Sequence, residues 1–258
     1  MFDFLLRIAF HVEHFYVLVV LSFDSCYNGC REVFCMRVGF VVAMESEYAP
    51  FLSGLGVAAK TDFVAGTEYV TYVSFVGITI LAKCGIGEIA AASATSILIG
   101  KYGCDYIVNF GLVGSLDDTK LHSLVAVKDV VHYDCDLTAF GQPLGMPADM
   151  KSVYFPADDR ALKGALKGLP AVRLASGDKF ISDSERKNNL VKSFGANVCD
   201  MEGAGIALVC ARARVPFSMI KLISDGADEG AVQTFEASKQ QAFGSAVEIV
   251  MKLLSDRD

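Results

Sequence analysis

The chain has 258 residues, of which 53% are hydrophobic and 21% are charged, and its formal net charge at pH 7 is −7. This composition excludes an intrinsically disordered protein, because the chain has enough apolar residues to form a large core. The sequence has no cluster of Lys and Arg, which argues against a nucleic-acid partner. The length is compatible with one α/β domain.

Residues 1–35 differ from the rest of the chain. Their apolar run, residues 15–23, is much shorter than the roughly 20 residues of a membrane-spanning helix, so no membrane partner is expected. Asp3 and Glu13 precede this run, which is unlike the basic start of an export signal. We expect an extension of doubtful order, or an artefact of an upstream start, before a domain of residues 36–258 in a cytoplasmic protein. A degenerate export signal is the minor alternative.

Eight cysteines are scattered along the sequence, at positions 26, 30, 35, 84, 104, 135, 199 and 210. Most lie inside apolar runs, which is typical of buried free thiols in a reducing compartment. Cys26 and Cys30 have a metal-like spacing, but no second pair or His follows at a matching distance. No metal and no cofactor are therefore expected.

Strand and helix patterns alternate from Met36 onward. Apolar and β-branched runs predict strands at 37–44, 104–111, 121–134, 171–178 and 217–224, and two or three strands within 62–85. Helices are predicted at 46–55, 87–103, 156–169, 183–194, 201–215 and 234–256. This alternation predicts an α/β fold with a mixed, largely parallel sheet that has helices on both faces.

Polar residues follow four of the predicted strands, at 44–47, 109–111, 176–178 and 224–225. Ligands of such sheets bind beyond the carboxyl ends of the strands, so these tips are expected to converge if the strands are parallel. No glycine-rich dinucleotide motif or P-loop follows a strand. No Ser-His or Cys-His pairing is visible either, and the chemistry is expected to depend on carboxylates.

Asp225 lies at the end of an apolar strand and follows Ser224. An Asp in this position is more often a turn residue, because its side chain bonds nearby backbone N–H groups. The alternative is a general acid, held by Ser224 and desolvated enough to be protonated when needed.

Two glutamates open predicted helices. Glu202 is either favoured there by the helix dipole or accepts two adjacent sugar hydroxyls, with Met201 as core filler or as an apolar wall beside the sugar. Glu47 is either another dipole-favoured residue or a general base that orients a water. Phe180 and Ile181 are core residues or the two sides of a slot for a flat heterocycle.

Taken together, these segments resemble the 5′-methylthioadenosine/S-adenosylhomocysteine nucleosidase family within the nucleoside phosphorylase superfamily. The resemblance extends from about Met36 to the C-terminus. Seven motifs carry it in order: AMESE (43–47), KCGIGEIAAA (83–92), NFGLVGSL (109–116), HYDCDLTAFG (132–141), SGDKFI (176–181), DMEGAGIA (200–207) and LISDGAD (222–228). Each is weak alone, and their common order along one domain is specific.

The resemblance implies a three-layer αβα sandwich, a homodimer, and hydrolysis of the N-glycosidic bond of a 5′-thioadenosine with release of adenine. It implies that Asp225, beside Ser224, protonates purine N7 and that Glu47 positions the attacking water. Glu202 would hold the ribose hydroxyls with Met201 against the sugar.

The same resemblance assigns the walls of the nucleoside site. Phe180 and Ile181 would frame the adenine, and Val113 and Gly114 lie in the loop whose backbone contacts the base. Phe235 would lie near the 5′ substituent. Phe140 and Pro147 would reach the pocket of the partner subunit.

Three alternatives stay open. A phosphate-dependent phosphorylase needs arginine or backbone clamps, whereas this sequence has AMESEYAP and KCGIGEIA at those places. A futalosine-type hydrolase is a second alternative, because Leu112-Val113, Asp200 and Lys221 depart from the common family pattern. A nucleoside-binding or storage protein is the third, but a protein that only binds needs no acid.

Overall fold

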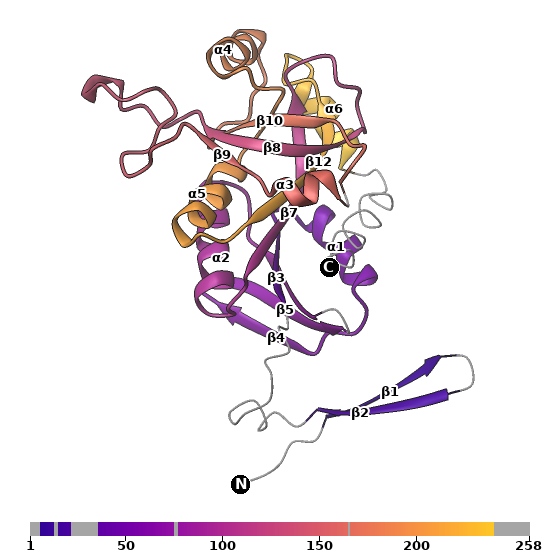
Figure 1. Ribbon diagram of the computed structural model, residues 1–258. Helices are drawn as coiled ribbons and strands as arrows, with labels where there is room; N and C mark the ends of the chain where they lie inside the picture. Colours follow the sequence, from indigo (N-terminus) through magenta and orange to yellow (C-terminus); the bar gives the residue numbers. More distant parts are fainter. Residues whose placement is uncertain (1–5, 13–14, 22–35, 75–76, 165, 240–258) are drawn as a thin grey trace. The chain divides into compact units, whose positions relative to one another are not determined.

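The computed structural model describes residues 6–12, 15–21, 36–74, 77–164 and 166–239 (Figure 1). The chain divides into two compact units, Met1–Cys35 and Met36–Asp258. The first contains an antiparallel hairpin of β1 (Leu6–Val12) and β2 (Phe15–Leu21). In the described residues, no helix has both the length and the apolar character needed to cross a membrane.

The second unit is built around a sheet with ten described strands. They are β3 (Arg37–Val42), β4 (Lys60–Val64), β5 (Thr67–Ser74), β6 (Gly77–Lys83), β7 (Tyr106–Ser115), β8 (Leu124–His132), β9 (Tyr154–Pro156), β10 (Ala171–Ser176), β11 (Val198–Asp200) and β12 (Phe217–Asp225). The order is β11-β10-β8-β12-β7-β3-β6-β5-β4, with β9 added to β8. The prediction of a mixed α/β sheet is confirmed.

The pairing β11–β7 closes part of this sheet on itself. Five strands, β7, β12, β8, β10 and β11, form a ring, because β11 pairs with β10 on one side and with the end of β7 on the other. Strand β12 is parallel to β7, and β8 is antiparallel to β12. The predicted parallel order therefore holds for β3, β6, β7 and β12. Strand β10 is parallel to β8 and so runs opposite to these four strands. It still lies near the end of β7, because the sheet curls and β11 pairs with both β10 and β7.

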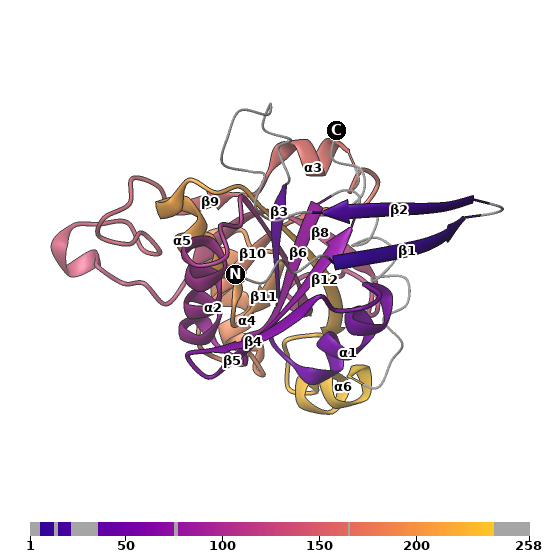
Figure 2. The ribbon, with the colours of Figure 1, turned by 90° about the horizontal axis from the view of Figure 1, so that it is seen from below.

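Helices cover both faces of the sheet. Their bounds are α1 (Glu45–Gly54), α2 (Glu88–Gly100), α3 (Asp159–Lys163), α4 (Ser184–Phe194), α5 (Gly203–Ala213) and α6 (Ala231–Ser238). Figure 2 shows α2 and α5 on one side of the strands, with α1 and α6 on the other. The apolar clusters agree: α2 and α5 contribute Leu98 and Ile206 to one core, and α1 contributes Phe51 to the other.

Two predicted helices differ from the structure. The helix predicted at 156–169 is short, because Gly164 ends α3 and residues 166–168 form turns. Glycine in a helix costs conformational entropy that a short helix does not recover. The helix predicted at 234–256 begins earlier, at Ala231. Its part from residue 240 onward lies outside the described residues.

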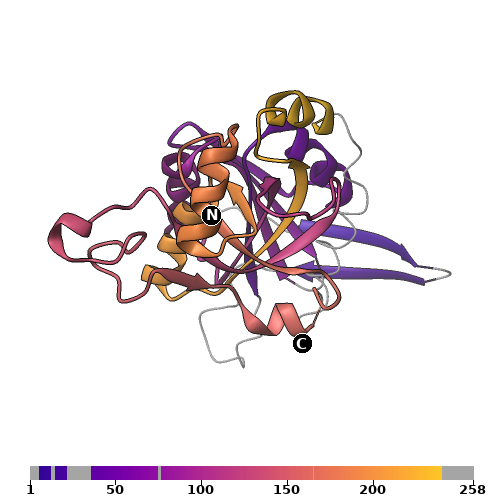
Figure 3. The ribbon, with the colours of Figure 1, turned by 90° about the horizontal axis from the view of Figure 1, so that it is seen from above.

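The segment between β8 and β9 projects from the body of the second unit in all three views (Figures 1, 2 and 3). It contains one turn of 3-10 helix, Thr138–Phe140. The Phe140 side chain is 81% exposed there. Four of the cysteines in the described residues, Cys84, Cys104, Cys199 and Cys210, are buried free thiols, and Cys135 is a half-buried one.

Candidate active site

A cavity of about 270 Å³ opens where β7, β12, β11 and the start of α1 meet. Nine of the residues expected from the sequence line it: Glu47, Val113, Gly114, Phe180, Met201, Glu202, Ser224, Asp225 and Phe235. Six further residues complete the lining: Ala43, Met44, Ile86, Leu112, Cys199 and Asp200.

One edge of β7 pairs first with β3 and then with β11, and the gap between these two partners makes room for the cavity. Strand β3 pairs with β7 as far as Asn109, and β11 pairs with it at Gly114 and Ser115. Between these pairings the edge changes partner, and the Leu112 N–H donates to the Glu47 side chain at 3.0 Å. Crevices at such changes of strand order are the usual ligand sites of α/β sheets.

Asp225 is aimed into the cavity by an irregularity at the end of β12. The register with β7 shifts between Ile223 and Asp225, and such bulges re-aim a side chain. The side chain is 2% exposed. Its Oδ1 accepts from the Ala227 N–H at 2.9 Å, and its Oδ2 lies 2.8 Å from Ser224 Oγ. Burial raises the pKa of this carboxyl, although the bonds from Ala227 and Ser224 oppose the increase.

The Ser224 hydroxyl links Asp225 to the backbone of β7. Its Oγ lies 3.1 Å from the Val113 carbonyl oxygen as well as 2.8 Å from Asp225 Oδ2. A hydroxyl has one proton to donate. The Ser224 proton can therefore go to Val113 while Asp225 is protonated, and can turn to Asp225 Oδ2 once the carboxyl has ionised.

Gly114 gives the acid its space. A Cβ at this position would lie 2.9 Å from Asp225 Oδ1 and 3.2 Å from Cys199 Sγ. Gly114 is paired with both β12 and β11. Any larger residue at position 114 would therefore displace the carboxyl or open the ring of strands.

Glu202 precedes the first turn of α5, and the start of α2 holds its carboxyl. The Gly87 N–H donates to Glu202 Oε1 at 2.9 Å. Burial, and next the charge of Asp200, raise the pKa of Glu202 to about 8, while Lys221 opposes the increase. A carboxyl with one oxygen bonded to Gly87 keeps acceptor capacity for a ligand hydroxyl.

Glu47 is 1% exposed and its two oxygens accept three backbone hydrogen bonds. The N–H groups of Ala43 and Met44 donate to Oε2, each at 3.0 Å, and Leu112 donates to Oε1. These bonds fix the carboxyl in one orientation. Burial raises its pKa in spite of the three donors and the positive charge of Lys221.

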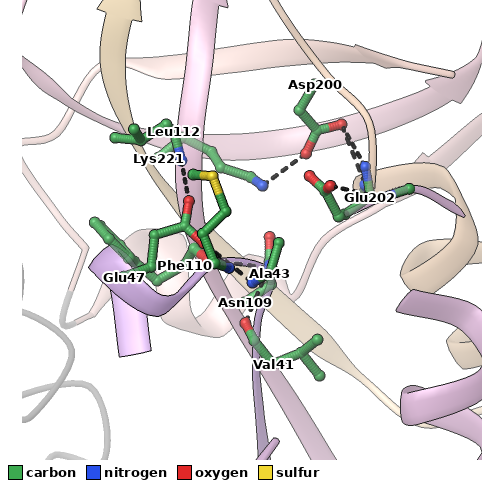
Figure 4. Close-up of polar contacts among 12 residues, drawn as sticks. Val41, Ala43, Glu47, Asn109, Phe110, Leu112, Asp200, Glu202 and Lys221 are labelled. Carbon is green, nitrogen blue, oxygen red and sulfur yellow. Dashed lines mark hydrogen bonds and ion pairs between the residues drawn. The ribbon is translucent and has the colours of Figure 1, made fainter. Parts of the chain in front are cut away.

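A buried ion pair lies among these carboxyls. Lys221 Nζ and Asp200 Oδ2 are 2.7 Å apart, and both side chains are 1% exposed. Asp200 Oδ1 also accepts from the Gly203 N–H at 3.1 Å. Figure 4 shows the ammonium reaching Asp200 beside Glu202, with Glu47 at the other side of the view. Lys221 is therefore paired with Asp200, and its charge also opposes the increase in the pKa of Glu202 and of Glu47.

Aromatic and apolar side chains form the remaining walls. The rings of Phe180 and Phe235 meet edge to face with centroids 5.5 Å apart. Phe180 is 38% exposed, which places this pair at the mouth of the cavity. Met201 and Ile86 also line the cavity, and such walls suit a flat heterocycle or an apolar substituent.

Three expected site residues lie elsewhere in the chain. Ile181 is 4% exposed and packs in the apolar cluster that includes Leu116 and Leu190 rather than lining the cavity. Phe140 lies at the tip of the projecting segment, and Pro147 is buried. The role of Phe140 and Pro147 in a partner subunit stays a prediction.

Sequence reasoning missed Ala43, Met44, Ile86 and Cys199 as lining residues. Ala43 and Met44 directly precede Glu47 and lie within the AMESE motif, and Ile86 lies in KCGIGE. The motifs that contain Ala43, Met44 and Ile86 were therefore identified, but no local pattern indicates which residues of a motif face a cavity. Cys199 directly precedes the DMEGAGIA motif. The ion pair of Lys221 with Asp200 joins residues 21 positions apart on different strands and has no sequence signal.

A larger cavity, about 430 Å³, lies at the opposite end of β12, near Phe217 and Arg214. Both acids in its lining already have partners: Asp158 accepts hydrogen bonds from Arg160, and Asp159 accepts one from Lys163. Within the described residues, no group of three or more His, Cys, Asp or Glu is arranged to hold a metal ion. The smaller cavity is the candidate active site because the acids converge there.

Residues 37–255 match the model of the Phosphorylase superfamily. The chain is 34% identical over 230 residues to the 5′-methylthioadenosine/S-adenosylhomocysteine nucleosidase of Shewanella loihica, covering 85% of this chain and 99% of that protein. The crystal structure of the Helicobacter pylori enzyme of that name with butyl-thio-DADMe-Immucillin-A is similar at a TM-score of 0.82 and 29% identity, covering 86% of this chain and 99% of that one.

The futalosine hydrolase of Helicobacter pylori is similar to nearly the same degree. Its TM-score is 0.81 at 28% identity, over 85% of this chain and 97% of that one. The likeness of fold therefore does not separate these two kinds of relative.

Proposed function

This chain belongs to the Phosphorylase superfamily, and on that premise we propose that it hydrolyses the N-glycosidic bond of 5′-methylthioadenosine and S-adenosylhomocysteine and releases adenine. The observation that carries the proposal is the meeting of Asp225, Glu202 and Glu47 in one cavity. A buried acid with a raised pKa is suited to donate a proton.

The proposed mechanism begins at the base. Asp225 donates its proton to purine N7, which neutralises the departing adenine as electrons move into its ring. A placed acid contributes roughly 10²–10⁴-fold to such a step. The backbone N–H of Ala227 and the hydroxyl of Ser224 then stabilise the carboxylate that remains.

The ribose develops positive charge as the base leaves. Glu202 holds the 2′- and 3′-hydroxyls, with Met201 against the sugar, and the carboxylates of the cavity that are ionised stabilise the oxocarbenium-like transition state. Glu47 has one accepted bond on Oε1 and two on Oε2, so Oε1 keeps acceptor capacity for the attacking water.

Water is favoured over phosphate as the nucleophile. The lining residues in the described part of the chain include four acids and no Lys or Arg. A dianion beside Glu47 would be repelled in this poorly solvated site. The Lys221 ammonium is already paired with Asp200.

A futalosine-type nucleoside is the second candidate substrate. It is favoured by the similarity to the Helicobacter pylori futalosine hydrolase, at a TM-score of 0.81. Such a substrate has hypoxanthine as its base, so it would still need an acid at N7 and a carboxylate at the ribose.

The test is adenine release from methylthioadenosine in phosphate-free buffer, repeated with phosphate. We expect free adenine and a reducing methylthioribose at a rate that phosphate does not change. A rate that requires phosphate and yields a sugar-1-phosphate would make the protein a phosphorylase. Turnover of a hypoxanthine nucleoside without turnover of methylthioadenosine would select the second candidate.

A further inference from the structure

The loop that carries Asp225 is conformationally strained. Ala227 has a positive φ of 49° and is fully buried. This left-handed conformation is unfavourable for an L-residue, because its Cβ lies too close to the following carbonyl oxygen. The loop therefore needs contacts that hold it, and the Ala227 N–H bond to Asp225 is one of them.

The first turns of α4 supply further contacts. Lys187 Nζ donates to the carbonyl oxygen of Gly226, next to the acid, at 2.7 Å. Ser184 donates to Glu229 through its N–H at 3.0 Å and its Oγ at 2.8 Å. Asp183 caps this helix by accepting from the Arg186 N–H. Helix α4 thus holds the loop at Gly226 and Glu229, on both sides of Ala227.

The charges around Asp225 oppose each other. Asp228, in the same loop, raises the pKa of Asp225, whereas the positive charge of Lys187 lowers it. The Cys199 thiol also faces the acid, and its pKa is raised above the usual range by burial. Lys187 further interacts with Glu229. Lys187 is therefore a cation that counters the effect of Asp228 on the acid.

We propose that Lys187 is a positioning residue for Asp225: through Gly226 it fixes the strained turn that carries the acid, and its charge sets the pH range in which the acid works. Lys187 does not line the cavity, so it acts through the loop and through its field. The kinetic test of this inference rests on the proposed function, whereas the titration test rests on the geometry of the loop.

The sign of the pH effect follows from the need for a protonated acid. Activity falls as the pH rises through the pKa of Asp225. Removal of the Lys187 charge removes an influence that lowers this pKa. The basic limb of the pH profile of kcat/KM should therefore move to higher pH, and loss of the Gly226 contact should lower kcat at every pH.

The kinetic test compares Lys187→Met, Lys187→Gln and Lys187→Arg in adenine release from methylthioadenosine. Lys187→Met should lower kcat by roughly tenfold, a modest loss for a displaced catalytic group. It should also move the basic limb of the pH profile to higher pH. Lys187→Gln should move the limb with a smaller loss of kcat, and Lys187→Arg should restore both. The matched control is Lys192→Met, which removes an exposed charge from the last turn of the same helix and should behave like the original protein.

A second substitution separates position from charge. Ala227→Gly removes the cost of the positive φ, so in the Lys187→Met background it should recover kcat and leave the basic limb displaced. Recovery of both properties, or of neither, would contradict the division of roles.

The titration of Asp225 tests the inference without any turnover. Isotope-labelled aspartate is followed by NMR, with Asp225→Asn identifying the signal. A higher titration midpoint in Lys187→Met than in Lys192→Met supports the inference, and equal midpoints overturn it. If the protein releases no adenine from methylthioadenosine, the proposed function fails, while this titration still decides the role of Lys187.

Discussion

The carboxyl of Asp225 combines burial with two hydrogen-bond donors that suit its ionised form. Hydrogen bonds from Ser224 and Ala227 favour the ionised carboxylate, whereas burial favours the protonated acid by raising its pKa. A turn aspartate on an exposed loop would have the hydrogen bonds without the burial. The 2% exposure of Asp225 therefore favours the catalytic interpretation of this residue.

Asp225→Asn should lower kcat for adenine release by roughly 10²–10⁴-fold, because the amide cannot supply a proton to N7. Binding of the substrate, measured by calorimetry, should change much less, since the amide has nearly the same shape. Melting temperature serves as the control for folding. A variant with kcat within tenfold of the original would contradict the assigned role.

Glu202 should make stability depend on pH. Its pKa is raised from 4.5 to about 8 in the folded chain, so the folded state binds more protons than the unfolded state between these values. Stability then falls as the pH rises through this window, because the unfolded chain ionises first. Glu202→Gln should be less sensitive, with a melting temperature that gains on the original protein from pH 4.5 towards pH 8. If the difference between the two melting temperatures stayed constant from pH 4.5 to pH 8, the raised pKa of Glu202 would be contradicted.

At the scale of elements, Lys221 in the middle of β12 forms an ion pair with Asp200 at the end of β11. A buried pair contributes little in comparison with apolar residues, but removal of one partner leaves an uncompensated charge. Both residues were noted in the sequence as departures from the pattern that the resemblance implies, and the structure shows that they contact each other.

Lys221→Met should destabilise the protein by about 3–5 kcal/mol, the usual cost of a broken buried pair. The double variant Lys221→Met with Asp200→Asn should recover a substantial part, because no unpaired charge remains. Urea unfolding of the two single variants and the double variant gives the coupling energy. Additive losses would show that the two side chains act independently.

The elements also show how far local patterns reach. Long apolar runs such as β12 and the Ala-rich α2 are close to their predicted bounds. The three-residue strands β9 and β11 were not predicted, because so few residues carry no periodicity. The end of β7 was also placed too early: its residues 112–115 are ordered as a strand by pairing with β12 and β11.

At the scale of the whole molecule, the projecting segment between β8 and β9 is the feature that a single protomer leaves unexplained. It exposes Phe140, and its apolar tip would be covered in a dimer of the kind that the resemblance implies. Large exposed apolar side chains grouped in one place often mark an interaction site.

Phe140→Ser should therefore raise KM more than it lowers kcat, because it would remove an apolar wall from the pocket of the other subunit. Sedimentation at assay concentration shows whether the protein is a dimer. Phe63→Ser is the matched control, since Phe63 is 74% exposed on β4 and outside the cavity lining. Equal effects of the two substitutions, or a monomer with full activity, would refute the shared pocket.

The sequence by itself determined the family, the alternation of strands and helices, and the motif residues whose carboxyls are proposed to do the chemistry. These properties are local, because each depends on residue type and short spacing. Only the tertiary structure decided how they meet. Four contacts join segments that are distant in the sequence. They are the closure of β11 on β7, the hydrogen bond from Gly87 to Glu202 across 115 positions, the ion pair of Lys221 with Asp200, and the contacts of α4 with the Asp225 loop. Such contacts depend on the path of the whole chain, and no short pattern encodes them.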